Sequence, residues 1–224
     1  MPKPSLRHGT GKWIETSLCD VCQEAELTGD EDRRRRRAIA EHLGRAGIPA
    51  LFASAELEGL RGDLQPALTE AMHDAKYNGK NLYLYGDTGR GKTHVAAALL
   101  KHGIRETARP GYFWSVPKLM DALRDGARGG RAAALTDELS RASALVLDDL
   151  GAEKVTEYAL ERLYMLLDHW CGEKRKRLVV TSNLSTGQIH DKLDPRIASR
   201  IVGMCRIVEV KGDDWRLKKA QGGA

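Results

Sequence analysis

Residues 86–93 read Gly86-Asp87-Thr88-Gly89-Arg90-Gly91-Lys92-Thr93, which is the pattern Gly-x4-Gly-Lys-Thr. The apolar run Leu82–Tyr85 precedes this stretch and a helical pattern from His94 to His102 follows it. Glycines let such a loop wrap a phosphate chain, so that backbone N–H groups and the helix N-terminus point at the anion. The order of strand, loop and helix therefore predicts a phosphate-binding loop.

Side chains of the same stretch have predicted roles in holding a nucleotide. Lys92 is expected to reach the β- and γ-phosphates, and the Thr93 hydroxyl is expected to bind Mg²⁺. The predicted binding set consists of Gly86, Asp87, Thr88, Gly89, Arg90, Gly91, Lys92, Thr93 and His94. An ordinary glycine turn before a helix is the alternative, and the flanking strand and helix patterns favour the phosphate site over it.

A second strand pattern supplies acids for the same site. The apolar residues 144–147 lead directly into Asp148 and Asp149. Because open α/β sheets place their ligands at the carboxyl ends of parallel strands, these acids are expected to face the phosphates. Asp148 is the predicted Mg²⁺ ligand, and Asp149 is predicted to orient or polarise the attacking water. The alternative is a strand that ends in a solvated acidic turn.

Short apolar runs alternate with helical patterns along most of the chain. The predicted strands are residues 81–85, 111–115, 144–148, 178–182 and 206–210. Long crossovers between five such strands imply a mainly parallel sheet sandwiched between helices. A helical pattern over residues 155–170 carries a wide apolar stripe that suits a helix covering this sheet. The predicted fold class is therefore α/β.

The first 55 residues differ from the rest of the chain. They contain a Cys-x-x-Cys, the arginine run 33–37, and a helical stretch that ends near Gly44 or Gly47. We expect residues 1–55 to form a small, mostly helical region and residues 56–224 to form the main domain. The length of 224 residues suits one α/β core with a smaller attachment.

Composition limits the class of protein. The formal net charge of +5 suits an anionic partner, and it suits an ordinary soluble protein equally well. No apolar run approaches the roughly 18 residues of a membrane span, and the start of the chain lacks the hydrophobic core of a signal peptide. We therefore expect a cytoplasmic protein without a membrane partner.

Further motifs resemble a known family. Residues 179–183 (Val-Val-Thr-Ser-Asn) on the fourth strand and residues 194–200 (Asp-Pro-Arg-Ile-Ala-Ser-Arg) before the fifth resemble the AAA+ ATPases. Residues 148–154 (Asp-Asp-Leu-Gly-Ala-Glu-Lys), followed by Thr-Glu-Tyr, look like the replicative helicase loaders of the DnaC and DnaI type and their phage relatives. The resemblance covers roughly residues 80–217 and does not extend securely to residues 1–55.

This resemblance implies roles for further residues. Asn183 takes the sensor-1 position, where a polar side chain helps to place the lytic water; the alternative is an Asn that caps the following turn. Arg196 and Arg200 lie one helical turn apart, and one of them, preferably Arg200, is implied to be an arginine finger that acts on a neighbouring subunit. Arg216 is implied to be the sensor-2 cation on a short terminal helix, which would replace a full lid. Asp149 stands where most AAA+ proteins have Glu, so slow basal ATP hydrolysis is expected.

Two cysteines supply half of a possible zinc site. Cys19 and Cys22 form a Cys-x-x-Cys, but four ligands are needed and no second such pair follows. His8 and His42 are the remaining candidates, at spacings that match no zinc motif. Two free thiols are the favoured alternative.

Arginines between the second and third strands are candidates for DNA contacts. In the loaders an insertion near here lines a central channel and holds single-stranded DNA, so the resemblance implies that Arg124, Arg128 and Arg131 contact a DNA backbone. A solvated surface is the alternative for each of them. The run Arg33–Arg37 is likewise a candidate for nucleic acid or an acidic protein surface, and a solvated helix face is the commoner outcome for such a run.

The resemblance leads first to the hypothesis of a helicase loader. An ATP-dependent loader would assemble through its AAA+ domain, grip a hexameric replicative helicase with its N-terminal region, and deliver it onto single-stranded DNA. An IstB-like transposase-helper ATPase would instead use the same motifs on duplex DNA. A small-molecule P-loop kinase would also carry the phosphate loop, and a nucleotide-binding adaptor would bind ATP and scarcely hydrolyse it.

Overall fold

The computed structural model describes residues 20–57, 66–78, 80–126, 130–152, 157–171 and 176–215. The chain divides into two compact units, residues 1–38 and residues 39–224. Helix α1 (Asp20–Arg45) begins in the first unit and ends in the second. Cys19 and the side chain of Cys22 lie outside the described part of the chain, and so do Arg128 and Arg216.

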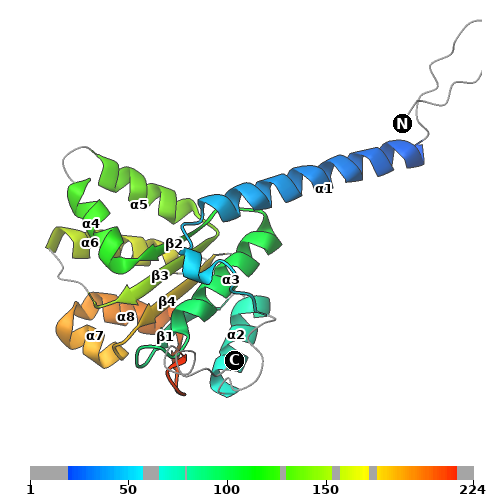
Figure 1. Ribbon diagram of the computed structural model, residues 1–224. Coiled ribbons are helices and arrows are strands. Elements are labelled where there is room, and N and C mark those ends of the chain that lie inside the picture. Colours follow the sequence, from blue (N-terminus) through cyan, green and yellow to red (C-terminus); the bar gives the residue numbers. More distant parts are fainter. Residues whose placement is uncertain are drawn as a thin grey trace, which may run out of the picture. The chain divides into compact units, whose positions relative to one another are not determined.

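The second unit is built around a five-stranded sheet. Its strands are β1 (Asn81–Tyr85), β2 (Gly111–Ser115), β3 (Ala144–Leu150), β4 (Arg177–Ser182) and β5 (Cys205–Glu209). They are arranged in the order β2-β3-β4-β1-β5, and every pairing is parallel (Figure 1). The predicted α/β class with a parallel sheet is confirmed.

Helices cover both faces of this sheet (Figure 1). They are α2 (Pro66–Asn78), α3 (Lys92–Thr107), α4 (Val116–Asp125), α5 (Arg131–Arg141), α6 (Glu157–Trp170), α7 (Thr186–Lys192) and α8 (Pro195–Met204), with a short 3-10 helix, η1 (Ala50–Phe52). No helix among the described residues is long and apolar enough to cross a membrane.

Alternating residues of the strands build two core layers, as the two-residue period of a strand requires. Leu82, Leu84, Val146 and Val179 pack with α2 and α3 on one face. Tyr83, Leu145, Leu147 and Val180 pack with α4 to α8 on the other face. The apolar stripe predicted for residues 155–170 lies in this second layer, where Leu163, Leu166 and Leu167 of α6 are buried.

The segment that follows α1 belongs to the second unit. Ala46 and Ala55 are buried in the layer formed by α2 and α3, and Phe52 packs against it. The backbone N–H of Phe113 donates to the carbonyl of Ala46 at 2.7 Å, so this segment also pairs with the edge strand β2. The second compact unit, residues 39–224, therefore includes this segment, whose small buried side chains follow no apolar period in the sequence.

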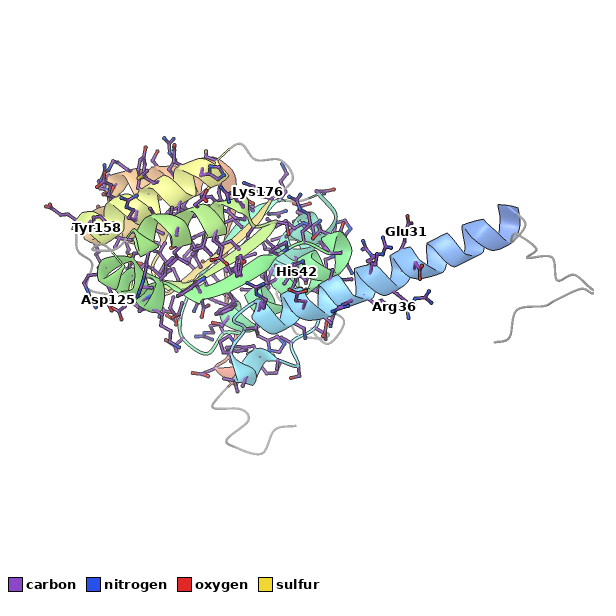
Figure 2. The ribbon with its side chains drawn as sticks, turned by 90° about the horizontal axis from the view of Figure 1, so that it is seen from above. Glu31, Arg36, His42, Asp125, Tyr158 and Lys176 are labelled. Atoms are coloured by element: carbon purple, nitrogen blue, oxygen red, sulfur yellow. The ribbon has the colours of Figure 1, made fainter. Side chains whose placement is uncertain are left out.

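The first unit contains the arginine run. Residues 31–37 of α1 are all exposed, and Figure 2 shows Glu31 and Arg36 projecting from this helix. Arg33 pairs with Asp30 one turn earlier. Such an exposed pair contributes little stability.

Candidate functional site

The predicted phosphate loop joins β1 to the N-terminus of α3. Gly86 has φ 138°, and a Cβ there would lie 2.5 Å from the carbonyl oxygen of Val210, so only glycine fits. Gly91 caps α3 in the left-handed conformation, with φ 84°. Helix α3 begins at Lys92, two residues earlier than predicted, so both Lys92 and Thr93 lie in its first turn. Backbone N–H groups at the N-terminus of a helix can bind an anion.

Lys92 connects the loop to the neighbouring strand. Only 5% of the residue is exposed. Its Nζ donates to the carbonyl oxygens of Gly86 at 2.7 Å and Asp87 at 2.8 Å, and to Oδ1 of Asn183 at 2.9 Å. The predicted phosphate-binding lysine and the predicted sensor residue therefore meet at the ends of β1 and β4.

Asp148 lies buried beside the same helix N-terminus. Burial raises the pKa of its carboxyl, while hydrogen bonds from the Thr181 and Thr93 hydroxyls and the charge of Lys92 act in the opposite direction. The Thr181 hydroxyl donates to Asp148 Oδ1 at 2.6 Å. Carboxylate and hydroxyl oxygens from Asp148 and Thr93 are the kind of ligands that Mg²⁺ takes, so the residues present fit this ion.

Asp149 lies inside β3 rather than after it, which corrects the predicted strand end at residue 148. The register shifts between Leu147, opposite Val180, and Leu150, opposite Ser182, so β3 carries one extra residue there. Asp149 has φ 60°, which is uncommon for a residue with a side chain. Its backbone N–H donates to Thr181 Oγ1 at 3.0 Å, and the residue is half-buried.

Asn183 follows β4 and is exposed apart from its contact with Lys92. In the turn after it, the Leu184 N–H donates to the Ser182 hydroxyl at 2.9 Å, and the Ser185 side chain accepts from the Gln188 backbone N–H at the start of α7. Ser185 and Gln188 form a complete capping box. Asn183 is thus available to the phosphate loop.

Arg196 and Arg200 share one face of α8, as their spacing predicts. Their guanidinium carbons lie 5.1 Å and 5.5 Å from the centre of the Tyr164 ring on α6. Arg196 also pairs with Asp194 at 2.9 Å, and Arg200 with Asp168 at 2.7 Å and with the Tyr164 hydroxyl at 3.0 Å. The two arginines are thus held at the α6 surface of their own chain.

Two segments flank the loop. On one side, His94 packs edge-on against Phe52, and burial lowers its pKa. On the other side, the N–H of Val210 donates to the Tyr85 carbonyl at 2.7 Å and that of Trp215 donates to the Gly89 carbonyl at 3.0 Å. The chain just before Arg216 therefore runs beside the phosphate loop.

Sequence reasoning missed Lys101, which anchors the segment before α2. It is 7% exposed, and its Nζ donates to the carbonyls of Ala53 at 2.7 Å and Ala55 at 2.9 Å and to the Glu56 carboxylate at 2.6 Å. Hydrogen bonds from Arg105 and Lys101 lower the pKa of Glu56 to about 2, although partial burial acts against them. No short motif marks this lysine, because its partners lie 45 to 48 residues away.

Other predicted residues lie apart from this site. Arg124 is exposed on α4, where it pairs with Asp121 at 2.8 Å, and Arg131 is exposed at the start of α5. Within the described residues, no three His, Cys, Asp or Glu side chains are grouped as metal ligands. The predicted zinc pair lies outside the residues whose side chains are described, so it stays a prediction.

Comparison with known proteins places these features in a family. Residues 19–222 match the family described as IstB-like ATP binding protein. A putative insertion sequence ATP-binding protein of Sinorhizobium fredii is 29% identical over 141 residues, which are 61% of this chain and 56% of that protein. An IS21-like putative ATP-binding protein of Bacteroides fragilis is 22% identical over 208 residues, or 88% and 75%. The chain thus spans just over half the length of the first of these relatives.

A solved structure shares the fold. The crystal structure of the DnaC helicase loader superimposes with a TM-score of 0.63 at 21% identity, covering 73% of this chain and all of that one. At this identity the similarity establishes the AAA+ fold and nothing finer.

Proposed function

Because the chain belongs to the IstB-like ATP-binding protein family and has the AAA+ fold, we propose that it is an ATPase that binds ATP at residues 86–93 and hydrolyses it slowly. One observation carries this proposal: Lys92 reaches from the phosphate loop to Asn183, while Asp148 lies beside Thr93. Loop, acid and strand-end amide are thus assembled within one chain.

The residues divide the work of hydrolysis. Lys92 and the N–H groups at the start of α3 bind the phosphates, and Lys92 exchanges its carbonyl and amide partners for phosphate oxygens. Thr93 and Asp148 would hold Mg²⁺, which neutralises phosphate charge when bound. Asp149 and Asn183 orient the attacking water. The shorter Asp149 side chain, in place of the usual Glu, leaves more distance to that water, which is the reason to expect slow turnover.

Arg200 completes the site from a neighbouring subunit, with Arg196 as the alternative finger. Both guanidinium groups pack against Tyr164 of α6 in their own chain, so this role requires the finger to exchange its intrachain partners for the phosphate of the neighbour. Arg196 is 60% exposed and Arg200 is 37% exposed, so both can be approached by another protein surface. Self-association through the ATPase unit follows from this role.

The family and its insertion-sequence relatives favour a transposase-helper role, in which ATP-dependent assembly on duplex DNA prepares a target for a transposase. Loading of a replicative helicase onto single-stranded DNA, the first expectation from the sequence, is the second candidate, and the fold shared with the DnaC loader supports it. In both cases the N-terminal region is the proposed partner-binding part.

Assembly and turnover on two DNA forms test these roles. The transposase-helper role predicts that ATP drives assembly on duplex DNA and that duplex DNA raises turnover more than single strands do; the loader role predicts the reverse preference and capture of a hexameric helicase. A chain shortened to begin at Ile39 should still bind ATP and should lose the partner. If neither duplex nor single-stranded DNA changes assembly or turnover, both roles are contradicted.

A further inference from the structure

Thr181 touches both acids of the site. It lies on β4 and is completely buried. Its hydroxyl donates to Asp148 Oδ1 at 2.6 Å and accepts from the backbone N–H of Asp149 at 3.0 Å. A threonine hydroxyl has a single proton, so these two bonds assign its orientation: the proton points at Asp148 and a lone pair points at Asp149.

The two bonds fix two different properties of β3. The bond to Asp148 holds a buried carboxylate in one orientation, beside Thr93 and Lys92. The bond from Asp149 holds the extra residue of the strand in its left-handed conformation, at φ 60°. Without this acceptor, the N–H of Asp149 would lose the partner that stabilises the irregular register between Leu147 and Leu150.

Thr181 also lies two residues before Asn183. Asn183 accepts from Lys92 at 2.9 Å, so the end of β4 contacts the metal side of the site through Thr181 and the phosphate side through Asn183. Ser182, between them, donates to the Leu150 carbonyl at 2.6 Å and closes the irregular part of the ladder. A single strand end therefore sets the relative positions of acids and lysine.

We propose that Thr181 is a positioning residue for the magnesium site, whose hydroxyl aims the Asp148 carboxylate at the ion and keeps Asp149 in place for the water. This proposal rests on the proposed ATPase function. Thr181 itself does not contact the nucleotide. It acts through Asp148 and Asp149, in the way that hydrogen-bond partners of metal ligands orient those ligands and tune their affinity.

Replacement by valine tests the hydroxyl with little change in shape. Equilibrium binding of a fluorescent ATP analogue is measured in EDTA and across a Mg²⁺ titration, for the full chain. Thr181→Val should bind the analogue in EDTA as the wild type does, and the Mg²⁺ concentration that gives the half-maximal gain in affinity should rise by about 10-fold or more. Thr181→Ser, which keeps a hydroxyl, should restore the wild-type midpoint.

A matched control removes a different buried hydroxyl. Ser143 is 4% exposed and donates to the Pro110 carbonyl at 2.9 Å, just before the start of β3 and so at the opposite end of that strand. Ser143→Ala should lower thermal stability and leave the Mg²⁺ midpoint unchanged. If Thr181→Val lowers thermal stability but keeps the wild-type Mg²⁺ midpoint, the role of Thr181 is structural only and the proposal is overturned.

Two further outcomes are decisive. If Thr181→Val does not fold, Thr181→Ala removes the hydroxyl without adding bulk, and an unchanged midpoint in that folded variant contradicts the proposal. If the wild type gains no affinity for the analogue with Mg²⁺, the proposed magnesium-dependent site itself is wrong. Failure of the Thr181 assignment is distinct, because the wild type then responds to Mg²⁺ and the valine variant responds identically.

Discussion

The phosphate loop and the arginine pair of α8 are held in different ways. Lys92 is buried, and its Nζ donates to two carbonyls of the loop and to the side chain of Asn183, which follows β4. Arg196 and Arg200 instead lie against Tyr164 at the surface of α6, with acids as partners. The first group is preorganised inside one chain, whereas the proposed finger role of the second group requires a neighbouring subunit. Binding should therefore belong to the monomer, and fast hydrolysis to the assembly.

The largest expected effect is on the rate of ATP hydrolysis, which should depend on the arginine pair while ATP binding does not. Arg200→Ala should bind ATP normally and lose the increase in turnover that accompanies assembly on DNA, because an arginine finger can contribute about 10³-fold. Mixing Arg200→Ala with Lys92→Met should restore part of that increase, since some junctions then pair an intact loop with an intact finger. Turnover measured against mixing ratio at fixed total protein tests this directly.

The same series includes Arg196→Ala as a control on the same helix face. A mixture that shows only the residual rates of its two components would exclude action of Arg200 on a neighbour. If a mixture of Arg196→Ala with Lys92→Met then restores turnover, Arg196 is the arginine finger.

The next effect lies within the preorganised region. Asp148→Asn keeps the shape of the side chain and removes its charge. The gain in ATP affinity that Mg²⁺ provides should therefore fall by at least about 10-fold, because replacing even a hydrogen-bond partner of a metal ligand lowers metal affinity by about that factor. Asp149→Asn should keep this gain and lose turnover. The Mg²⁺ dependence of calorimetric ATP binding, beside a steady-state phosphate assay, distinguishes the two acids. Equal Mg²⁺ dependence in both variants would contradict the separate roles.

The smallest expected effect concerns Glu56, in the segment before α2 that Lys101 anchors. The folded-state pKa of Glu56 is lowered to about 2 from an ordinary value of 4.5, so its contribution to stability is present above pH 4.5 and is lost as the pH falls toward 2. Because its side chain is 35% exposed, solvent screening limits this contribution to about 1 kcal/mol. Glu56→Gln should therefore lower the free energy of unfolding by this amount at pH 7.

Urea denaturation of wild type and Glu56→Gln at pH 7 and pH 3 measures the difference. The difference in the free energy of unfolding between the two proteins should be smaller at pH 3 than at pH 7. A gap that is independent of pH would assign the effect of Glu56 to packing rather than to its charge.

The sequence signals for the candidate site are strongest where the residues are close together in the chain. The glycines, Lys92 and Thr93 form a contiguous motif, and the strand before Asp148 marks that acid, so the positions of these residues could be predicted. Asn183 could be singled out only through the family resemblance, and its sensor role stays a prediction; the structure places its side chain in contact with Lys92.

The rest depends on pairings between distant segments. Thr181 reads as an ordinary β-branched strand residue, and only the shifted register of β3 against β4 brings its hydroxyl to both acids. The contacts of Arg196 and Arg200 with the Tyr164 ring join α8 to α6. Ala46 and Ala55 give no periodic signal, so the start of the compact unit at Ile39 could not be predicted either.

The central claim is that one chain holds a preformed nucleotide site in which Lys92 contacts the phosphates. Calorimetric titration of ATP and Mg²⁺ into dilute wild type, Lys92→Met and Lys80→Met tests it; Lys80 is an exposed lysine just before β1 and serves as the matched control. Thermal unfolding first establishes that each variant is folded. We predict that wild type and Lys80→Met bind alike and that Lys92→Met loses at least about 10-fold in affinity, the loss of one charge-assisted hydrogen bond. Wild-type affinity in a folded Lys92→Met protein would contradict the claim.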